Sequence, residues 1–141
     1  MKARIRIPAR IVATALVAGC ISLVPVVSSA FVPEDLAQLK STNKCPGCDL
    51  RAADLRGMEL ADANLEGANL MGANLTGVTL TDATLEDASL EKANFSKANL
   101  KGASLDHATI DDAVFTGADL QDMTWTDGKV CGRGSIGVCK K

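Results

Sequence analysis

A five-residue period runs without a break through the middle of the chain, and it restricts the possible folds more than any other feature of the sequence. Residues 48–127 divide into sixteen consecutive pentads, whose first residue is usually alanine. A fold for this segment must bury one large apolar side chain in every five, at the third position of each pentad. These residues are Leu50, Leu55, Leu60, Leu65, Leu70, Leu75, Leu80, Leu85, Leu90, Phe95, Leu100, Leu105, Ile110, Phe115, Leu120 and Trp125.

A period of five fits neither an α-helix, with about 3.6 residues per turn, nor a strand, which alternates every second residue. If each pentad instead forms one side of a square coil, its third residue points to the axis and its small first residue fits beside it. Four pentads then complete a turn of about twenty residues, and successive turns stack about 4.8 Å apart. Residues 48–127 therefore predict an all-β solenoid of about four turns, a rod roughly 20 Å long.

The square coil also predicts which side chains become neighbours. Residues about twenty positions apart fall into one column on adjacent turns. Phe95 and Phe115 share an inner column, so their rings are expected to stack. Burying each apolar side chain is worth about 1.5–3 kcal/mol, and in a linear repeat this gain is distributed over neighbouring turns.

The pattern resembles the pentapeptide-repeat family, whose motif is Ala-(Asp/Asn)-Leu-X-X. The resemblance covers 80 of the 141 residues and implies a right-handed quadrilateral β-helix. The flanking sequences Cys-Pro-Gly-Cys-Asp-Leu and Gly-Ser-Ile-Gly-Val-Cys are also similar to those of exported bacterial members, including cyanobacterial ones. The closest motif matches are Ala53-Asp54-Leu55, Ala63-Asn64-Leu65, Ala68-Asn69-Leu70, Ala73-Asn74-Leu75, Ala98-Asn99-Leu100 and Ala118-Asp119-Leu120.

The first thirty residues have the pattern of a targeting segment. Four basic residues and no acidic one precede an apolar run at residues 11–27, and small residues follow at 28–30. This order is typical of a signal peptide, here cleaved after Ala30. We therefore expect an exported protein, located in the periplasm or, in a cyanobacterium, in the thylakoid lumen.

Two alternatives to cleavage after Ala30 remain open. Val17-Ala18-Gly19-Cys20 resembles a lipobox, in which Cys20 would be acylated and anchor a lipoprotein. The residues after Cys20 stay apolar, however, whereas a lipoprotein usually continues with a polar tether. An uncleaved anchor is the other alternative, but the apolar run contains Pro25 and is shorter than the about 20 residues that span a bilayer comfortably.

Cleavage would leave an acidic protein. The full chain has 15 basic and 17 acidic residues, and the four charges in residues 1–30 are all basic, so the remaining 11 and 17 give a net charge of −6. With one Trp, no Tyr and no basic run, the protein lacks the positive surface and stacking platforms of a nucleic-acid binder. Neither nucleic acid nor, after cleavage, a membrane is an expected partner.

Both ends of the coil are expected to be capped, because an open end exposes apolar residues and unpaired backbone. Residues 31–47 form the predicted N-terminal capping segment, with a short helix at 32–39 that begins at a proline and two acids. Residues 128–141 form the predicted C-terminal cap, a disulfide loop that closes over Trp125. With both ends covered, a monomer is expected.

The four cysteines outside the signal segment favour two disulfide bonds in an oxidising compartment. The simplest pairing joins Cys45 to Cys48 and Cys131 to Cys139. Alternatively, Cys45 and Cys48 form a redox pair, which would normally need a helix N-terminus to lower a thiol pKa, or half of a zinc site. Zinc would require all four sulfur atoms to converge from opposite ends of a rod about 20 Å long, so no metal is expected.

No catalytic constellation is visible in the sequence. His107 is the single histidine, and there is no nucleophile motif, phosphate loop or metal-ligand spacing. We therefore expect a non-enzymatic protein without a cofactor, acting as an exported protein-interaction or structural module. One alternative is a DNA mimic that binds gyrase, as in quinolone-resistance pentapeptide proteins, which the signal peptide and the few turns disfavour. The other is a thiol redox protein that uses Cys45 and Cys48.

The outward columns around the last side of the square are acidic, and we call this surface the acidic face. Like charges about 5 Å apart on neighbouring strands repel, so such a surface is either solvated or attracts something cationic. The opposite side carries Arg56, Lys97 and the polar column Thr76, Ser96 and Thr116. A basic protein, not identified by the sequence, or a cation is therefore expected to bind the acidic face. The acidic face comprises Asp62, Glu66, Asp82, Glu86, Asp87, Asp106, Asp122 and Asp127, with His107 between Asp87 and Asp127 in its column.

Overall fold

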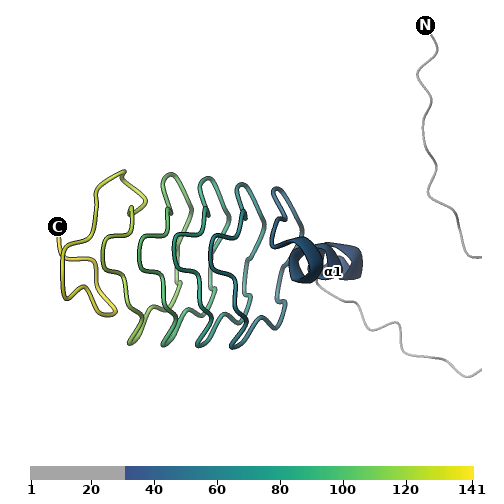
Figure 1. Cartoon of the computed structure of the whole chain (residues 1–141), viewed down its shortest axis with the longest axis horizontal. Helices are drawn as coiled ribbons and strands as arrows, with labels where there is room; N and C mark the ends of the chain where they lie inside the picture. Colours follow the sequence, from purple (N-terminus) through teal and green to yellow (C-terminus); the bar gives the residue numbers. More distant parts are fainter. Residues whose placement is uncertain (1–30) are drawn as a thin grey trace, which may run out of the picture.

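The computed structural model describes residues 31–141. The predicted signal peptide, its cleavage after Ala30 and the alternative lipidation of Cys20 lie outside the described residues. The described chain begins with helix α1, Pro33–Thr42, and continues as a stack of turns that ends in a C-terminal segment (Figure 1). Within this range, no helix has the length and apolar character needed to cross a bilayer.

Both ends of helix α1 are explained by the residues found there. Pro33 opens the helix, at a position where its missing N–H removes no helical hydrogen bond, and Glu34 and Asp35 lie at the positive end of the helix dipole. Asn43 ends the helix with a φ of 57°, and its N–H donates to the Leu39 carbonyl at 2.9 Å. The helix predicted at residues 32–39 is thus present and extends to Thr42.

Helix α1 covers the N-terminal end of the rod (Figure 1). The N–H of Asp49 donates to Asp35 Oδ2 at 2.7 Å, and the N–H of Val32 donates to the Asp49 carbonyl at 3.0 Å. Leu39 is buried against the first turn. These contacts make α1 the N-terminal cap.

After helix α1, the chain forms a coil whose turns contain twenty residues each. Parallel bridges join residues twenty positions apart, from Lys44 with Asn64 to Ser104 with Thr124. Each turn therefore consists of four pentads, and we number its sides from the pentads at 48–52, 53–57, 58–62 and 63–67. Every parallel bridge joins two isolated residues, each at the second position of a pentad, so the strand content of this predicted all-β coil is low.

The coil begins one pentad earlier than the repeat pattern predicts. Lys44 bridges Asn64, and the N–H of Cys45 donates to the Asn64 carbonyl at 2.7 Å, as an inner residue does. Residues 43–47 therefore belong to the fourth side of the coil rather than to the capping segment. The pentad is hard to recognise because Cys45 takes the inner position that is leucine or an aromatic residue elsewhere on this side.

The pentad motif follows from the turn at each corner. The N–H of Ala68 donates to the Leu65 carbonyl at 3.0 Å and closes the turn, whose second central residue, Gly67, has a φ of 63°. The Asn64 Oδ1 accepts from the Glu66 N–H at 3.1 Å. Asn or Asp at the second position thus caps the turn, and a small residue at the first position fits beside the axis.

The axis of the rod is filled by the third residues of the pentads. Leu55, Leu75 and Phe95 on the second side are all fully buried. The rings of Phe95 and Phe115 stack with centroids 5.1 Å apart and planes 3° apart, which confirms the predicted column. The core is therefore a continuous apolar column rather than a single globular centre.

Candidate functional site

The acidic face lies at the two corners that border the fourth side. Its residues occupy the fourth and fifth positions of their pentads, which form the turns. The bridged residues of the side between these corners are neutral: Asn64, Thr84, Ser104 and Thr124. The corner before the fourth side carries Asp62, Asp82 and Asp122, and the corner after it carries Glu66, Glu86, Asp87, Asp106 and Asp127.

Two residues of the acidic face contact polar side chains nearby. The Ser104 hydroxyl donates to Glu86 Oε1 at 2.9 Å, which links adjacent turns. His107 Nδ1 lies 3.3 Å from Asp106 Oδ2. The ion-pair neighbour of His107 is therefore Asp106, rather than its column neighbours Asp87 and Asp127.

Asp127 differs from the rest of the acidic face because two lysines neutralise it. Lys141 Nζ donates to Asp127 Oδ2, and Lys129 Nζ lies 3.5 Å from the same oxygen. The hydrogen bond from Lys141 holds the pKa of Asp127 below its usual range. Asp127 therefore fixes the C-terminal segment and contributes less negative charge than the sequence suggests.

Six carboxylates of the acidic face have no ion-pair partner among residues 31–141: Asp62, Glu66, Asp82, Glu86, Asp87 and Asp122. On the opposite side, Arg56 forms an ion pair with Asp54 at 2.7 Å, and its hydrogen bond lowers the pKa of Asp54. Six unpaired carboxylates thus lie at the corners of the fourth side, while Arg56 is locally neutralised.

The four cysteines form two disulfide-bonded pairs at opposite ends of the rod. Cys45 is joined to Cys48 in the first turn, and Cys131 is joined to Cys139 in the C-terminal segment. The exposed fraction is 0% for Cys45 and 6% for Cys48, so both are buried. Across the described part of the chain, no group of three or more His, Cys, Asp or Glu side chains is arranged to hold a metal ion.

The C-terminal segment turns back instead of continuing the coil. Antiparallel bridges join Thr124 to Val130 on the fourth side and Asp119 to Ile136 on the third side. Beyond Gly137 the segment leaves this path, because Cys139 is bonded to Cys131. The third and fourth sides of the last turn are therefore covered.

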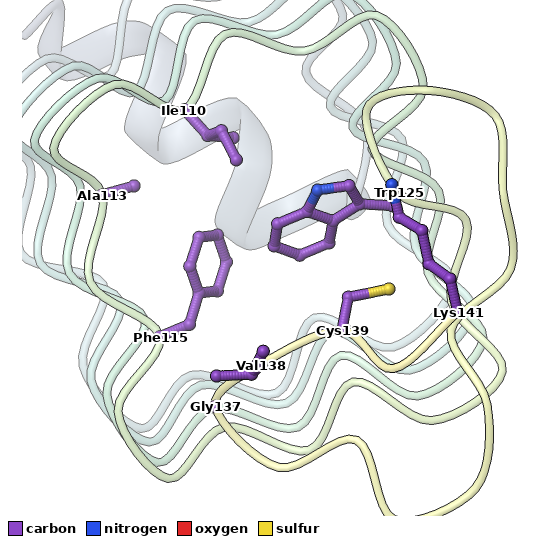
Figure 2. Close-up of a pocket in the computed structure, with 8 residues that line it drawn as sticks. All are labelled: Ile110, Ala113, Phe115, Trp125, Gly137, Val138, Cys139 and Lys141. Carbon is purple, nitrogen blue, oxygen red and sulfur yellow. The ribbon is translucent and has the colours of Figure 1, made fainter.

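This return leaves a pocket of about 370 Å³ at the C-terminal end of the axis. Figure 2 shows Ile110, Phe115 and Trp125 pointing into it from the last turn, with Val138 and Cys139 of the C-terminal segment along one side. The Phe115 and Trp125 rings lie 5.4 Å apart and are tilted by 56°. The predicted loop over Trp125 is thus an incomplete lid, which bounds the pocket together with Ala113, Gly137 and Lys141.

Comparison with known proteins identifies the repeat. The Pentapeptide repeats family model matches residues 48–87 and 85–122, with eight copies of the repeat. The chain belongs to the pentapeptide-repeat family. The match ends before Trp125 and the C-terminal segment, so the residues that close the rod lie beyond it. No curated protein sequence matches this pentapeptide-repeat protein.

Solved structures of the family resemble this pentapeptide-repeat protein. HetL from the cyanobacterium Nostoc sp. strain PCC 7120, involved in heterocyst differentiation regulation, is 35% identical over 62% of this chain, with a TM-score of 0.60. The match spans 40% of HetL. Rfr23 from the cyanobacterium Cyanothece 51142 is 24% identical over 64% of this chain and 82% of its own, with a TM-score of 0.53, which supports the fold alone.

Two features of this pentapeptide-repeat protein were not predicted from its sequence: the pocket, and the pairing of Asp127 with Lys141. The pocket has a sequence signal, because the residues twenty positions after Ile110 and Phe115 are Val130 and Ser135, which lie outside the pentads. The ion pair has none, since it depends on how the last residues fold back.

Proposed function

We propose that this pentapeptide-repeat protein is an exported, non-enzymatic interaction module whose acidic face binds a basic protein. The proposal rests on the six carboxylates without an ion-pair partner in the described chain, at the two corners that border one side of the rod. We further infer that the coil has the right-handed quadrilateral form of its family. The sequence of residues 1–30 supports delivery to the periplasm or the thylakoid lumen.

The geometry of the acidic face favours recognition of a partner's surface over catalysis. Each free carboxylate is exposed on a turn, and the neutral side between the two corners is lined by hydroxyl and amide side chains. Apolar side chains fill the axis, so reacting groups cannot converge there. A flat, negatively charged surface attracts basic partners and accelerates their association, and salt weakens both effects.

The two alternative functions receive less support. A thiol redox protein needs an accessible sulfur atom, whereas the Cys45–Cys48 bond is buried beneath α1 and the first turn. A gyrase-binding DNA mimic would act on a cytoplasmic enzyme, whereas residues 1–30 favour export.

Charge reversal of one column tests the proposed function. The triple variant Glu66→Lys, Glu86→Lys, Asp106→Lys should lose capture of the basic partner in crosslinking from the native envelope, by about tenfold or more. The matched control is Thr76→Lys, Ser96→Lys, Thr116→Lys, which places lysines at the same pentad position on the second side. Capture should persist in this control, and equal capture by both variants would contradict the proposal.

A further inference from the structure

The last turn of the coil ends in an unpaired backbone edge over its first and second sides. In the turn below, the N–H groups of Leu90 and Phe95 donate to carbonyls of the next turn at 2.8 and 2.7 Å. The corresponding N–H groups of Ile110 and Phe115 have no acceptor among residues 31–141, and neither has that of Asp112.

The carbonyl groups along this edge are unpaired as well. The carbonyls of Ala88 and Ala93, one turn below, accept from Thr109 and Val114 at 3.0 and 2.9 Å. In the structure described, no donor reaches the carbonyls of Ala108 and Ala113. The edge thus presents the donors and acceptors that would pair a further turn of the coil.

The C-terminal segment is held away from this edge by three contacts. Cys139 is bonded to Cys131, the Gly132 N–H donates to the Lys140 carbonyl at 2.6 Å, and Lys141 pairs with Asp127. The segment therefore lies over the third and fourth sides and over the corner at residues 115–117. In Figure 2 it does not run alongside Ile110 and Ala113. Gly137 lies against the Phe115 carbonyl and the Gly117 N–H, so the free edge ends at Phe115.

An apolar pocket lies next to the unpaired edge. Ile110 and Ala113 are partly exposed, whereas Leu90 and Ala93 in the turn below are fully buried. Ile110 and Ala113 line the pocket together with Phe115 and Trp125. Its volume of about 370 Å³ is within the size range of ligand sites. An apolar side chain standing above Ile110 or Phe115 would enter it, as the next turn does elsewhere in the coil.

The two outermost side chains beside the edge are unpaired carboxylates. Asp111 and Asp112 are exposed at the corner after Ile110, and neither has an ion-pair partner within residues 31–141. In the turn below, Glu91 lies under Asp111 and Lys92 lies under Asp112, so the outermost pair of side chains at this corner is the acidic one. A strand that follows this corner is therefore favoured if it carries a basic residue there.

We propose that the C-terminal end of the rod is a strand-addition site for an extended segment of another protein. The segment pairs with Ile110, Asp112 and Phe115 through its carbonyls and with Ala108 and Ala113 through its N–H groups. It carries apolar residues at two positions five apart, which enter the pocket above Ile110 and Phe115. One or two basic residues directly after the first apolar residue face Asp111 and Asp112. This mode combines backbone pairing for affinity with side-chain pockets for specificity.

A designed peptide tests this inference. Residues 88–97 pair with the first and second sides of the last turn from below, so the same sequence with Glu91 replaced by lysine, Ala-Ser-Leu-Lys-Lys-Ala-Asn-Phe-Ser-Lys, imitates a further turn. Trp125 is the only tryptophan in the chain, so its fluorescence reports occupation of the pocket. We expect a saturable fluorescence change and slower amide hydrogen exchange at Ile110, Asp112 and Phe115.

Two control peptides separate edge pairing from simple apolar binding. N-methylation at the second and seventh peptide residues removes the donors to Ala108 and Ala113, and replacing the peptide's Leu and Phe by Ser removes the groups that enter the pocket. Each change should weaken binding by about tenfold or more. Equal affinity of the N-methylated peptide, or no fluorescence change at peptide concentrations on the order of 1 mM, would overturn the proposal.

Matched protein variants test the charge requirement. Asp112→Lys should weaken binding of the designed peptide, and lysine is tolerated there because Lys92, directly below, has the same backbone conformation, with a φ of 59° against 60°. Asp87→Lys, at the same pentad position on the acidic face, should leave peptide binding unchanged. Equal weakening by both variants would contradict the proposed position of the basic residues.

The oligomeric state of the protein without peptide, together with amide exchange at the edge, shows whether a second copy already occupies this edge. If sedimentation gives a dimer in which the amides of Ile110 and Phe115 are already protected from exchange, a second copy occupies the edge and the proposal is wrong. A monomer with fast exchange at these amides supports it. Because the site does not include the acidic face, its failure leaves partner capture by that face unaffected.

Discussion

The carboxylate of Asp82 lies in the space that a side chain on Gly102 would occupy. The two residues share one corner column, and a Cβ built on Gly102 would collide with Asp82 Oδ1. Gly102 also has a φ of 71°, in the left-handed region. In the column that contains Asp82 and Asp122, the absence of a side chain on Gly102 therefore leaves room for the Asp82 carboxylate.

Gly102→Ala should destabilise the rod more than Gly77→Ala. Both positions have positive φ, so each substitution should cost about 1 kcal/mol from backbone strain. Nothing lies within 4 Å of a Cβ on Gly77, whereas at Gly102 the Asp82 side chain must also leave its rotamer, for about 0.5–1.5 kcal/mol more. Urea denaturation of both variants measures the difference, and equal midpoints would show that Asp82 moves freely.

Phe95→Ala should destabilise the fold more than Phe115→Ala. Phe95 is fully buried between turns, so truncation should cost about 3–5 kcal/mol. Phe115 already borders the pocket, so removing its ring enlarges an open space rather than creating a closed cavity. Thermal and urea unfolding provide the measurement. A larger loss for Phe115→Ala would mean that the C-terminal end, not the middle of the axis, limits stability.

The paired substitution Cys131→Ser, Cys139→Ser should release the C-terminal segment. The bond closes a loop with a sequence separation of 8, for which the loss of chain entropy in the unfolded state is worth about 2–3 kcal/mol. We expect a lower unfolding midpoint and Trp125 fluorescence shifted towards that of exposed tryptophan. Peptide mapping without reductant should return the pairs Cys45–Cys48 and Cys131–Cys139, and four free thiols in exported protein would contradict the structural role.

Acid should loosen the C-terminal end through Asp127. The hydrogen bond from Lys141 lowers the pKa of Asp127 in the folded protein from the ordinary value of 3.8. The stabilisation from this pair is therefore fully present above about pH 3.8. It is lost as the pH falls through the lower pKa of the folded state. Asp127→Asn should remove this part of the pH dependence of Trp125 fluorescence. Asp87→Asn, which affects an unpaired carboxylate, is the control and should retain it.

N-terminal sequencing of protein recovered from the envelope should begin at Phe31. Cleavage after Ala30 removes the basic and apolar segment in one step. An acylated Cys20 at the N-terminus would instead establish a lipoprotein, and a free Met1 would establish an uncleaved anchor.

The sequence predicts the coil well because its register follows directly from the position of each residue in the repeat. Once each pentad forms one side, the Phe95–Phe115 stack follows from a separation of twenty residues. The pentad at residues 43–47 was not predicted because its inner residue is Cys45 rather than a large apolar residue. The end of the repeat above Ile110 and Phe115 is visible in the sequence. The lining of the pocket and the Asp127–Lys141 pair could not be derived, since both depend on a C-terminal segment without repeat, whose path is set by a disulfide bond and antiparallel pairing.

The bridges between residues twenty positions apart also determine how such a rod can change length during evolution. Gain or loss of one pentad would rotate every later residue by a quarter turn, moving the acidic corners out of line and presenting a different side to the C-terminal segment. Gain or loss of four pentads would return every column to its place. Viable length variants of this protein should therefore differ by whole turns.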